Sequence, residues 1–358
     1  MVRKLASVQK IISLSPIENA DKIEKATVLG WELVVKKGEF KVDDFVVYIE
    51  IDSIMPEKPE FEFLRVRKFK VKTIKLRGQV SQGICFPLSI LSKKKYIEGQ
   101  DVTELIGVTK YESGAERQER IQNEIKSNRV KKFFMKYSWF RRLFTPDRMH
   151  WPDFIKKTDE DRIQVMPQVL QQYKDEYFEI TEKLDGQSGT YFLIRNPKKW
   201  QFWKPFIFGV CSRNFLKGKK ENNTWWRIAE QYDIENKLKQ VIDDNEYIVI
   251  QGELIGESIQ KNKYDIKGLD FYVFNVFTDK QNNSGKFKYE ICKQLNLKEV
   301  PFITNDFQLK DTINEMVEYA KGKSVLKDIH REGIVVRNYS KNISFKVVNP
   351  DFLLKYEE

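Results

Sequence analysis

Two hydrophobic patterns divide the chain. Up to about residue 110, apolar and polar residues alternate or cluster in short runs, as in ATVLGWELVVKKGEFKVDDFVVYIEIDS, interrupted by Gly30 and the turn Lys36–Gly38. From Arg65 to Leu76 basic and apolar residues alternate, which predicts a strand with a basic solvent face before a turn at Gly78. Several short strands of this kind predict a small β-barrel over residues 1–110. An OB-fold is our first choice, although the pattern fits other small barrels equally.

From about residue 150 onward, strand-like and helix-like segments alternate. Runs of β-branched and aromatic residues predict strands at 177–181, 188–195, 206–212, 246–255, 271–277, 333–337 and 343–348. Helical patterns predict helices at 159–173, 224–240, 286–296 and 310–320. Residues 151–358 are therefore expected to form an α+β domain, and we see no internal repeat.

Residues 111–150 have a third pattern and are expected to link the two domains. The stretch after Gly114 contains neither Gly nor Pro up to Phe144, which predicts a helix with Ser113 as its N-cap. Its second half mixes basic with aromatic residues: Arg129, Lys131, Lys132, Phe133, Phe134, Lys136, Tyr137, Trp139, Phe140, Arg141 and Arg142. Such a mixture binds single-stranded nucleic acid or docks as an amphipathic helix. We favour docking, with the basic side left free for nucleic acid.

The net charge of the chain indicates which kinds of binding partner to expect. The 358 residues suit two domains, and they carry a formal net charge of +11 with a pI of about 9.2. This surplus favours a polyanionic partner, with nucleic acid first and an anionic membrane surface second. The plain alternative is a proteome that is rich in lysine throughout.

Cysteine and histidine positions exclude several classes of site. The three cysteines (Cys85, Cys211 and Cys292) lie far apart, and His150 and His330 form no cluster with them. Neither a Cys/His metal centre nor a disulfide framework is predicted, which indicates a reducing, cytoplasmic compartment. The start of the chain lacks an apolar signal core, and no apolar run reaches the roughly 20 residues of a membrane span. We expect a soluble, intracellular monomer.

One motif places charge where strands are expected. TEKLDG (181–186) lies between two apolar runs. Burying an unpaired lysine is costly, so either this strand edge is exposed to solvent or Lys183 is functional. Lys-x-Asp-Gly alone is a weak signal. Five further segments follow it in order: CSRN (211–214), VIQGELIGE (249–257), DFYVFNVF (270–277), REGIVVR (331–337) and SFKVV (344–348).

This ordered series resembles that of the covalent nucleotidyltransferases, the superfamily of RNA ligases, DNA ligases and mRNA capping enzymes. FIKKTDEDRIQ (154–164) is similar to a segment that precedes the nucleophile in RNA ligases. PIENADKIEKATVLGW and KTIKLRGQVSQGI resemble the RNA ligases that carry an OB-fold ahead of the catalytic domain. The resemblance covers most of the chain. It implies an ATP-dependent RNA ligase with an ATP-grasp-like nucleotidyltransferase domain, acting in RNA repair.

The resemblance also implies the chemistry of Lys183. Its amine would attack the α-phosphate of ATP, expel pyrophosphate and hold AMP, which then passes to the 5′-phosphate of an RNA end. A 3′-hydroxyl would finally displace AMP and close the strand. A lysine attacks only when neutral, so neighbouring cations such as Lys346 and a bound metal are expected to lower its pKa.

The other motif residues receive roles by the same resemblance. Glu253 and Glu332 would bind Mg²⁺ or Mn²⁺ directly or through water, and Asp185 would hold a metal-bound water. Lys346 would contact the α-phosphate. Arg213 would contact the ribose or the RNA end, and Phe274, or failing that Phe271, would stack on adenine. Glu182 and Gly186 complete the nucleotide site. Taken singly, each residue also has a structural explanation, as a surface charge, a turn cap or a core aromatic.

The sequence departs from the family pattern in its last motif. That motif often reads Lys-x-Lys, whereas only Lys346 is present here, so one phosphate contact must be supplied elsewhere or omitted. Basic residues of the first domain such as Lys75 or Arg77 could supply it. DNA ligases and capping enzymes usually place the OB-fold after the catalytic domain, and only a dozen residues follow Lys346. A non-catalytic RNA-binding homologue would be expected to lose Lys183, Glu253, Glu332 or Lys346, and all four are present.

Overall fold

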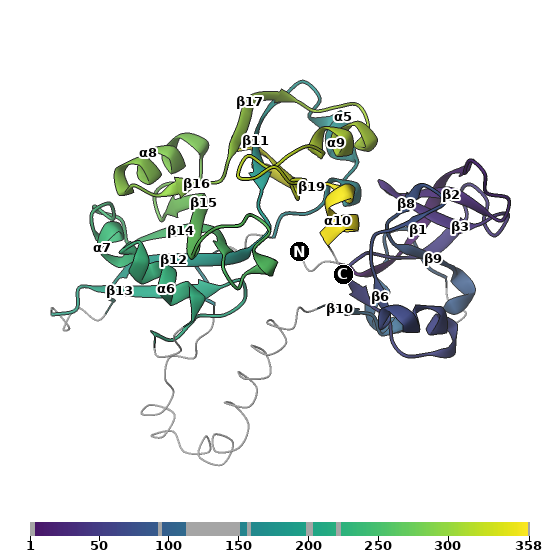
Figure 1. Cartoon of the computed structure of the whole chain (residues 1–358), viewed down its shortest axis with the longest axis horizontal. Coiled ribbons are helices and arrows are strands. Elements are labelled where there is room, and N and C mark those ends of the chain that lie inside the picture. The colour runs from purple at the N-terminus through teal and green to yellow at the C-terminus, as the bar shows by residue number, and fades with distance from the viewer. Residues whose placement is uncertain are drawn as a thin grey trace, which may run out of the picture. The chain divides into compact units, whose positions relative to one another are not determined.

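The computed structural model describes residues 4–91, 95–111, 151–155, 159–197, 203–219 and 223–356. These residues belong to two compact units (Figure 1). The first contains the amino-terminal part of the chain with Ile163–Val169 and the residues from Leu353 on, and the second contains Leu170–Phe352 with the segment that ends at Arg162. The linker predicted at 111–150, with its helix and its basic, aromatic half, lies outside the described residues from position 112 on.

A curled antiparallel sheet forms the first unit, as the alternating pattern predicts. Its strands are β1 (Ala6–Pro16), β2 (Ile23–Val28), β3 (Trp31–Lys36), β4 (Phe45–Ile49) and β9 (Ile84–Pro87), in the order β3-β2-β1-β4-β9. The first half of β1 pairs with β4 and its second half with β2, and the register shifts between Ile11 and Ser13. Such a bulge bends the strand, so one sheet curls around its own core. Trp31 and Tyr48 are fully buried there.

The long connection between β4 and β9 differs from the sequence prediction. It contains β5 (Ser53–Ile54), the 3₁₀ helix η1 (Pro59–Arg67), β6 (Lys70–Val71), β7 (Ile74–Leu76) and β8 (Gln79–Ser81). The single strand predicted from Arg65 to Leu76 is wrong, because Lys68 and Phe69 adopt φ values of 50° and 58°, which break an extended backbone. After the short elements η2 (Leu88–Ile90) and α1 (Thr103–Ile106), β10 (Thr109–Lys110) pairs with β5.

Two sheets frame the second unit. One has the order β17-β11-β18-β19, with β11 (Tyr177–Lys183), β17 (Phe302–Gln308), β18 (Gly333–Asn338) and β19 (Ile343–Val348). The other has the order β13-β12-β14-β15-β16, with β12 (Gln187–Arg195), β13 (Phe206–Ser212), β14 (Tyr247–Gly256), β15 (Leu269–Thr278) and β16 (Lys298–Glu299). Every strand predicted from the sequence for this second unit is confirmed. β16 and β17 were not predicted; β16 has two residues, and β17 is a largely exposed edge strand without an apolar run.

Helices cover one face of the five-stranded sheet. α6 (Thr224–Gln231), α7 (Ile234–Lys239) and α8 (Gly285–Leu295) bury their apolar residues against it. The helix predicted at 224–240 is divided into α6 and α7 because Asp233 adopts a left-handed φ of 50°. α8 and α9 (Ile313–Ala320) confirm the other two predictions, and α10 (Pro350–Tyr356) follows β19. Among the described residues, no helix combines the length and apolarity needed to cross a membrane.

The helix predicted at 159–173 is wrong for most of its length. Its helical parts are η3 (Ile163–Val165) and α5 (Gln168–Gln172), separated by Pro167, which has no amide hydrogen. Before η3 the chain lies along β19: the Lys346 amide donates a hydrogen bond to the Asp161 carbonyl at 2.8 Å, and Arg162 forms a parallel bridge with Lys346. Pairing with a distant strand therefore overrides the local helical pattern.

The two faces of the five-stranded sheet have different environments. Side chains such as Ile250, Leu254 and Phe271 pack against the helices in the main core. Because successive residues of a strand point to opposite faces, Glu253 of β14 projects to the other face. That face is turned toward the four-stranded sheet, since Arg337 of β18 donates a hydrogen bond to the Phe274 carbonyl of β15 at 3.0 Å.

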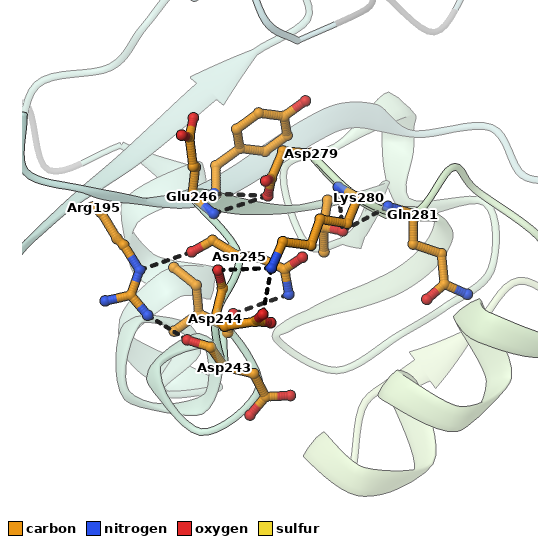
Figure 2. A network of polar contacts seen from close by, with 11 residues as sticks. Arg195, Asp243, Asp244, Asn245, Glu246, Asp279, Lys280 and Gln281 are labelled. Carbon is orange, nitrogen blue, oxygen red and sulfur yellow. Dashed lines mark hydrogen bonds and ion pairs between the residues drawn. The ribbon is translucent and has the colours of Figure 1, made fainter.

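Polar contacts join three segments at the end of β12 that lies away from Gly186 (Figure 2). Arg195 donates to the backbone carbonyls of Asn245, at 2.9 Å, and Asp243. The Asp279 carboxylate accepts hydrogen bonds from the backbone amides of Glu246, at 2.9 Å, and Tyr247, at 3.4 Å. Lys280 forms an ion pair with Asp244. The network holds the turn before β14 against the turn after β15.

We expect Asp279→Ala to lower the free energy of unfolding by about 1 kcal/mol, because two backbone amides lose their acceptor. The loss is measured by denaturant unfolding followed by tryptophan fluorescence. Lys280→Ala is the matched control. It removes an ion pair whose side chains are 51% and 83% exposed, and exposed pairs stabilise little. A loss in the control as large as in Asp279→Ala would contradict this explanation.

Candidate active site

Lys183, which the sequence singles out, ends β11. Its sheet partner is Gly333, the first residue of β18, so Lys183 lies beside Glu332. The Lys183 Nζ forms an ion pair with the Glu332 carboxylate, and the two side chains are 25% and 13% exposed. The fold thus brings together two charges that are 149 positions apart, in a site largely closed to solvent.

Close approach of two chain segments explains Gly186. A Cβ atom at this position would overlap the Leu254 carbonyl oxygen and would lie 3.0 Å from the Cγ atom of Glu253. Glycine has no Cβ, so the segment after Lys183 can lie directly against β14, the strand that carries Glu253. Next to Gly186, the Asp185 amide donates a hydrogen bond to the Tyr264 hydroxyl at 2.9 Å, and its carboxylate pairs with Lys263.

Charges in this site are mutually coupled. Burial raises the pKa of Glu253 to about 8; Lys183 opposes this shift, whereas Glu332 and Asp185 reinforce it. The pKa of Glu332 is also raised, by burial and by Asp185, against the opposing effects of Lys183 and Lys346. Such effects are strong only between groups separated by about 4–6 Å. The structure therefore gathers the predicted catalytic residues around one small volume.

The same acids also affect the pKa of the Lys183 amine. Burial lowers the pKa of Lys183, but attraction by Glu332, Glu253 and Asp185 outweighs burial, and the pKa is raised. The sequence analysis expected neighbouring cations and a metal to lower it. In the protein alone the close neighbours are acids, and Lys346 acts on Glu332 instead. A cation bound among the acids would oppose their effect and favour release of the proton from Lys183.

Glu253 and Glu332 have the properties of divalent-cation ligands. Oε2 of Glu332 is buried without a hydrogen-bond partner, and the raised pKa of Glu253 reflects an acid lacking compensating charge. Carboxylate oxygens suit Mg²⁺ and Mn²⁺. Within the described part of the chain, no three Asp, Glu, His or Cys side chains are close enough to hold an ion alone. Water or phosphate oxygens would complete the shell. Asp185 is engaged by Lys263 and is a less direct candidate than the sequence predicted.

The predicted base-binding residues differ in accessibility. Glu182 is 1% exposed, and its carboxylate accepts a hydrogen bond from the Val325 amide at 2.8 Å. Burial raises the pKa of Glu182. Phe274 is partly buried at the edge of a cluster that includes Leu184 and Tyr264. Phe271, the second choice for stacking on adenine, is wrong, because its ring is fully buried in the core beneath the helices.

Arg337 is a residue of this site that sequence reasoning missed. Its guanidinium donates to the Phe274 carbonyl at 3.0 Å and to Glu160 at 3.1 Å, and it lies 6.0 Å from the centre of the Phe274 ring. The Arg337 side chain is 7% exposed. It therefore ties β18 to β15 and to the segment before η3. The sequence offered one indication of Arg337, its position at the end of the REGIVVR motif. A charged residue on a predicted strand does not by itself show which residues it contacts.

Residues 159–162 contact strands of both sheets of the second unit or the residues next to them. Asp159 pairs with Arg213 just after β13, Glu160 pairs with Arg337 of β18, and the Asp161 carbonyl accepts from the Lys346 amide of β19. This explains why an acidic run precedes the nucleophile in the sequence. Arg213 remains 40% exposed beside its partner, so it is accessible to a ligand.

The last motif still lacks a second cation. Lys346 lies opposite Val335 in the sheet. Two residues before it, Ser344 has a buried hydroxyl without a hydrogen-bond partner, and two residues after it Val348 is 4% exposed. Neither position supplies positive charge, so the departure from the family pattern is real.

Comparisons with known proteins show which family the chain resembles. A model of an OB-fold domain matches residues 5–88, and a model of RNA ligases matches residues 176–356. The structure of Naegleria gruberi RNA ligase with PPi is 32% identical, with a TM-score of 0.80 and 99% coverage of both chains. A variant of that ligase with ATP and Mn is 30% identical, with a TM-score of 0.80 and coverage of 99% of this chain and 100% of the other. A search of curated proteins finds no match.

These matches extend over both units. The OB-fold model falls on the curled sheet of the first unit, and the RNA ligase model spans Lys183, Glu253, Glu332 and Lys346. Identity of 30–32% over nearly the full length confirms the resemblance noted in the sequence. The chain belongs to the RNA ligase family, with an α+β nucleotidyltransferase domain preceded by an OB-fold domain.

Proposed function

We propose that this chain is an ATP-dependent RNA ligase that joins a 3′-hydroxyl to a 5′-phosphate through lysyl-AMP and RNA-adenylate. The observation that carries the proposal is the ion pair of Lys183 with Glu332, both of which influence the pKa of the buried Glu253. The structures of Naegleria gruberi RNA ligase with ATP and Mn and with PPi support the choice of ATP and a divalent cation.

The reaction proceeds in three transfers. The neutral Lys183 amine attacks the α-phosphorus of ATP; the N–P bond forms, the bond to pyrophosphate breaks, and the amine proton leaves to solvent. The 5′-phosphate of an RNA end then displaces Lys183 and takes the AMP. Finally the 3′-hydroxyl attacks that phosphate, loses its proton, and releases AMP. Each transfer depends mainly on alignment and charge neutralisation.

Residues around Lys183 provide this alignment. Glu253 and Glu332 would hold Mg²⁺ or Mn²⁺, which supplies charge neutralisation at the phosphates. Lys346 binds the α-phosphate, and Arg213 binds the ribose or the RNA end through its planar guanidinium. Phe274 stacks on the adenine, while Glu182 and Asp185 fix the chain on either side of Lys183. Gly186 lets this segment lie against β14.

Incubation with α-labelled nucleotides tests the proposal. Label from ATP is expected to become covalently bound to the protein, and pyrophosphate is expected to discharge it. Label from GTP alone would identify a capping-type nucleotidyltransferase instead. Absence of bound label from either nucleotide, in the presence of Mg²⁺ or Mn²⁺, would favour a non-catalytic RNA-binding homologue.

Arg337→Lys is expected to raise the KM for ATP in adenylation about tenfold, with a smaller change in kcat. Lysine keeps the charge but cannot contact Glu160 and the Phe274 carbonyl at once, so the adenine platform loses its alignment. Initial rates of adenylation over a range of ATP concentrations measure the effect. Arg227→Lys, on the surface helix α6, is the control. An unchanged KM in Arg337→Lys would show that this contact is only structural.

Adenylation should accelerate as the pH rises from about 6 to about 9. The pKa of Lys183 is raised, so the amine is mostly protonated, and each pH unit increases its neutral fraction about tenfold. Glu253, with a pKa of about 8, loses its proton over the same range and becomes able to hold a cation. Both changes act in the same direction. Single-turnover formation of protein-bound AMP measures the rate, and a rate that falls with pH would contradict this assignment.

The form of the RNA substrate can be tested by comparing the sealing of different nicked duplexes. We propose that the 3′-hydroxyl strand is RNA, as the family implies, and that the ends can lie at a nick in a duplex. Sealing assays on nicked duplexes with RNA or DNA on the 3′-hydroxyl side test this choice. Equal sealing of both would favour a DNA ligase activity.

We also propose three broader properties. The OB-fold domain spans 1–110 and the nucleotidyltransferase domain spans 151–358, joined by the basic linker 111–150; the two family models, at 5–88 and 176–356, support this division. The protein acts as a monomer. It works in a reducing compartment such as the cytoplasm, in agreement with the free thiols of Cys85, Cys211 and Cys292.

A further inference from the structure

The connection between β4 and β9 concentrates positive charge. Residues 65–77 contain seven Lys and Arg residues and no Asp or Glu. Arg65 is compensated by Glu57 and Glu62. Among the described residues, no ion pair is found for Lys68, Lys75 or Arg77. The fold therefore leaves these three charges available for a partner.

The charges lie along a line rather than in a cluster. β6 and β7 hold Lys70–Val71 and Ile74–Leu76 extended, and at about 3.3 Å per residue the stretch from Lys70 to Arg77 spans roughly 20–25 Å. Lys75 and Arg77 are exposed. A line of cations suits the regularly spaced phosphates of a polynucleotide better than it suits a single small anion.

Apolar side chains are exposed just before this line. Phe63 and Val66 are 58% and 92% exposed, and residues three apart in a 3₁₀ helix share a side. The residues that hold η1 to the barrel, Phe61 and Leu64, are 1% exposed. The Phe63 ring contacts the Phe86 ring, with 6.3 Å between centroids. A ring that is supported at one side and otherwise open can stack on an unpaired base.

Two of the cations occupy unfavourable backbone positions. Lys68 has a φ of 50°, and Arg77 has a φ of 48° beside Gly78 at 86° in the turn between β7 and β8. Asn and Gly are the residues preferred at such positions. Keeping cations there is locally costly, and such strain is often retained where a side chain has a function.

We propose that Phe63, Val66, Lys68, Lys75 and Arg77, the β4–β9 surface, bind a single-stranded part of the RNA substrate. This inference rests on the proposed function, because it assigns the RNA-binding residues of the same enzyme. The exposed ring requires an unpaired base, which favours a single strand over a duplex. A second copy of the chain would meet this surface with like charge.

The double variant Lys68→Asn with Arg77→Asn tests the charges. Asparagine suits the left-handed backbone better than Lys or Arg, so the fold is retained while two charges are removed. We expect affinity for a fluorescein-labelled, 5′-phosphorylated single-stranded RNA to fall about tenfold, and the salt slope to fall by ~0.7 for each lost phosphate contact. Lys37→Gln with Lys41→Gln removes equal charge from exposed positions of the same unit and should bind like the wild type. Unchanged binding by the Asn variant, or equal loss in both, would overturn the proposal.

Phe63→Ala tests the stacking. Single-stranded RNA binding is expected to weaken about tenfold, with duplex RNA binding unchanged, and Phe63→Tyr should restore it. Unchanged single-strand binding, or an equal loss for duplex RNA, would overturn the assignment of a single strand.

Adenylation without RNA separates this inference from the proposed function. Phe63→Ala and the single variant Lys68→Asn should form protein-bound AMP at the wild-type rate while sealing more slowly at limiting RNA. If the wild-type chain formed no adenylate, the proposed function would fail, and the RNA titrations would still decide whether the β4–β9 surface binds RNA.

Discussion

Lys183→Ala is expected to abolish covalent AMP formation completely while leaving the sealing of pre-adenylated RNA measurable. In the proposed mechanism the Lys183 amine is the atom that displaces pyrophosphate from the α-phosphorus of ATP, so its removal deletes the first transfer. The later transfers occur between RNA groups and need the surrounding charges rather than this bond. Gel detection of label from α-labelled ATP, and ligation of RNA already carrying a 5′-adenylate, measure the two activities separately.

Folding of the variant needs its own check. Removing Lys183 leaves Glu332 without its ion-pair partner, which is destabilising for a largely buried charge. The pKa of Glu332 is already raised by burial, so its carboxyl can take up a proton instead. Lys183→Met with Glu332→Gln removes both charges and provides a second test. Lys239→Ala, on the exposed face of α7, is the control. Protein-bound AMP in either Lys183 variant would show that another residue is the nucleophile.

Glu253→Gln is expected to slow adenylation by about 10²- to 10³-fold, the effect typical of removing one preorganised electrostatic contact. The amide keeps the size of the carboxylate but loses the charge that would hold a divalent cation. The rate should therefore also require more Mn²⁺ or Mg²⁺ to reach its maximum. Adenylation rates over a metal titration measure both effects.

A nearby acid provides the comparison for this variant. Glu257 lies just beyond β14 and is exposed, so Glu257→Gln should leave the rate and the metal requirement unchanged. Removing the acid at 253 also lowers the pKa of Lys183, which by itself would speed attack. A faster reaction in Glu253→Gln would mean that this acid restrains the amine and does not hold the metal.

Local patterns of the sequence predicted most of the framework. The strands predicted for the second unit, together with α8 and α9, are present where their apolar runs indicated, whereas β16 and β17 were not predicted. Errors occurred where a non-local partner decided the backbone. The predicted helix at 159–173 instead begins as an extended segment along β19, and the predicted strand at 65–76 begins in η1. Neither partner is visible from residues nearby in the sequence.

The sequence predicted residues that the structure brings close together, but not their electrostatics. An ordered series of motifs identified Lys183, Glu253 and Glu332, because nucleotidyl transfer needs an amine and hard oxygen donors. The sequence could not show that these acids raise the pKa of Lys183, since that depends on distances between strands. The contacts of Arg337 with Glu160 and Phe274 were likewise hidden, because each lies on a different segment.

The sequence by itself determined the family and the order of the two domains, and it predicted the nucleophile, since these follow from motif order and from side-chain chemistry. Only the tertiary structure decided which charges share the cleft, how far the amine is held protonated, and which cations of the first unit are left without acidic partners. Coulombic interactions and burial depend on separation in space, and the chain brings residues 183 and 332 together only when two strands pair.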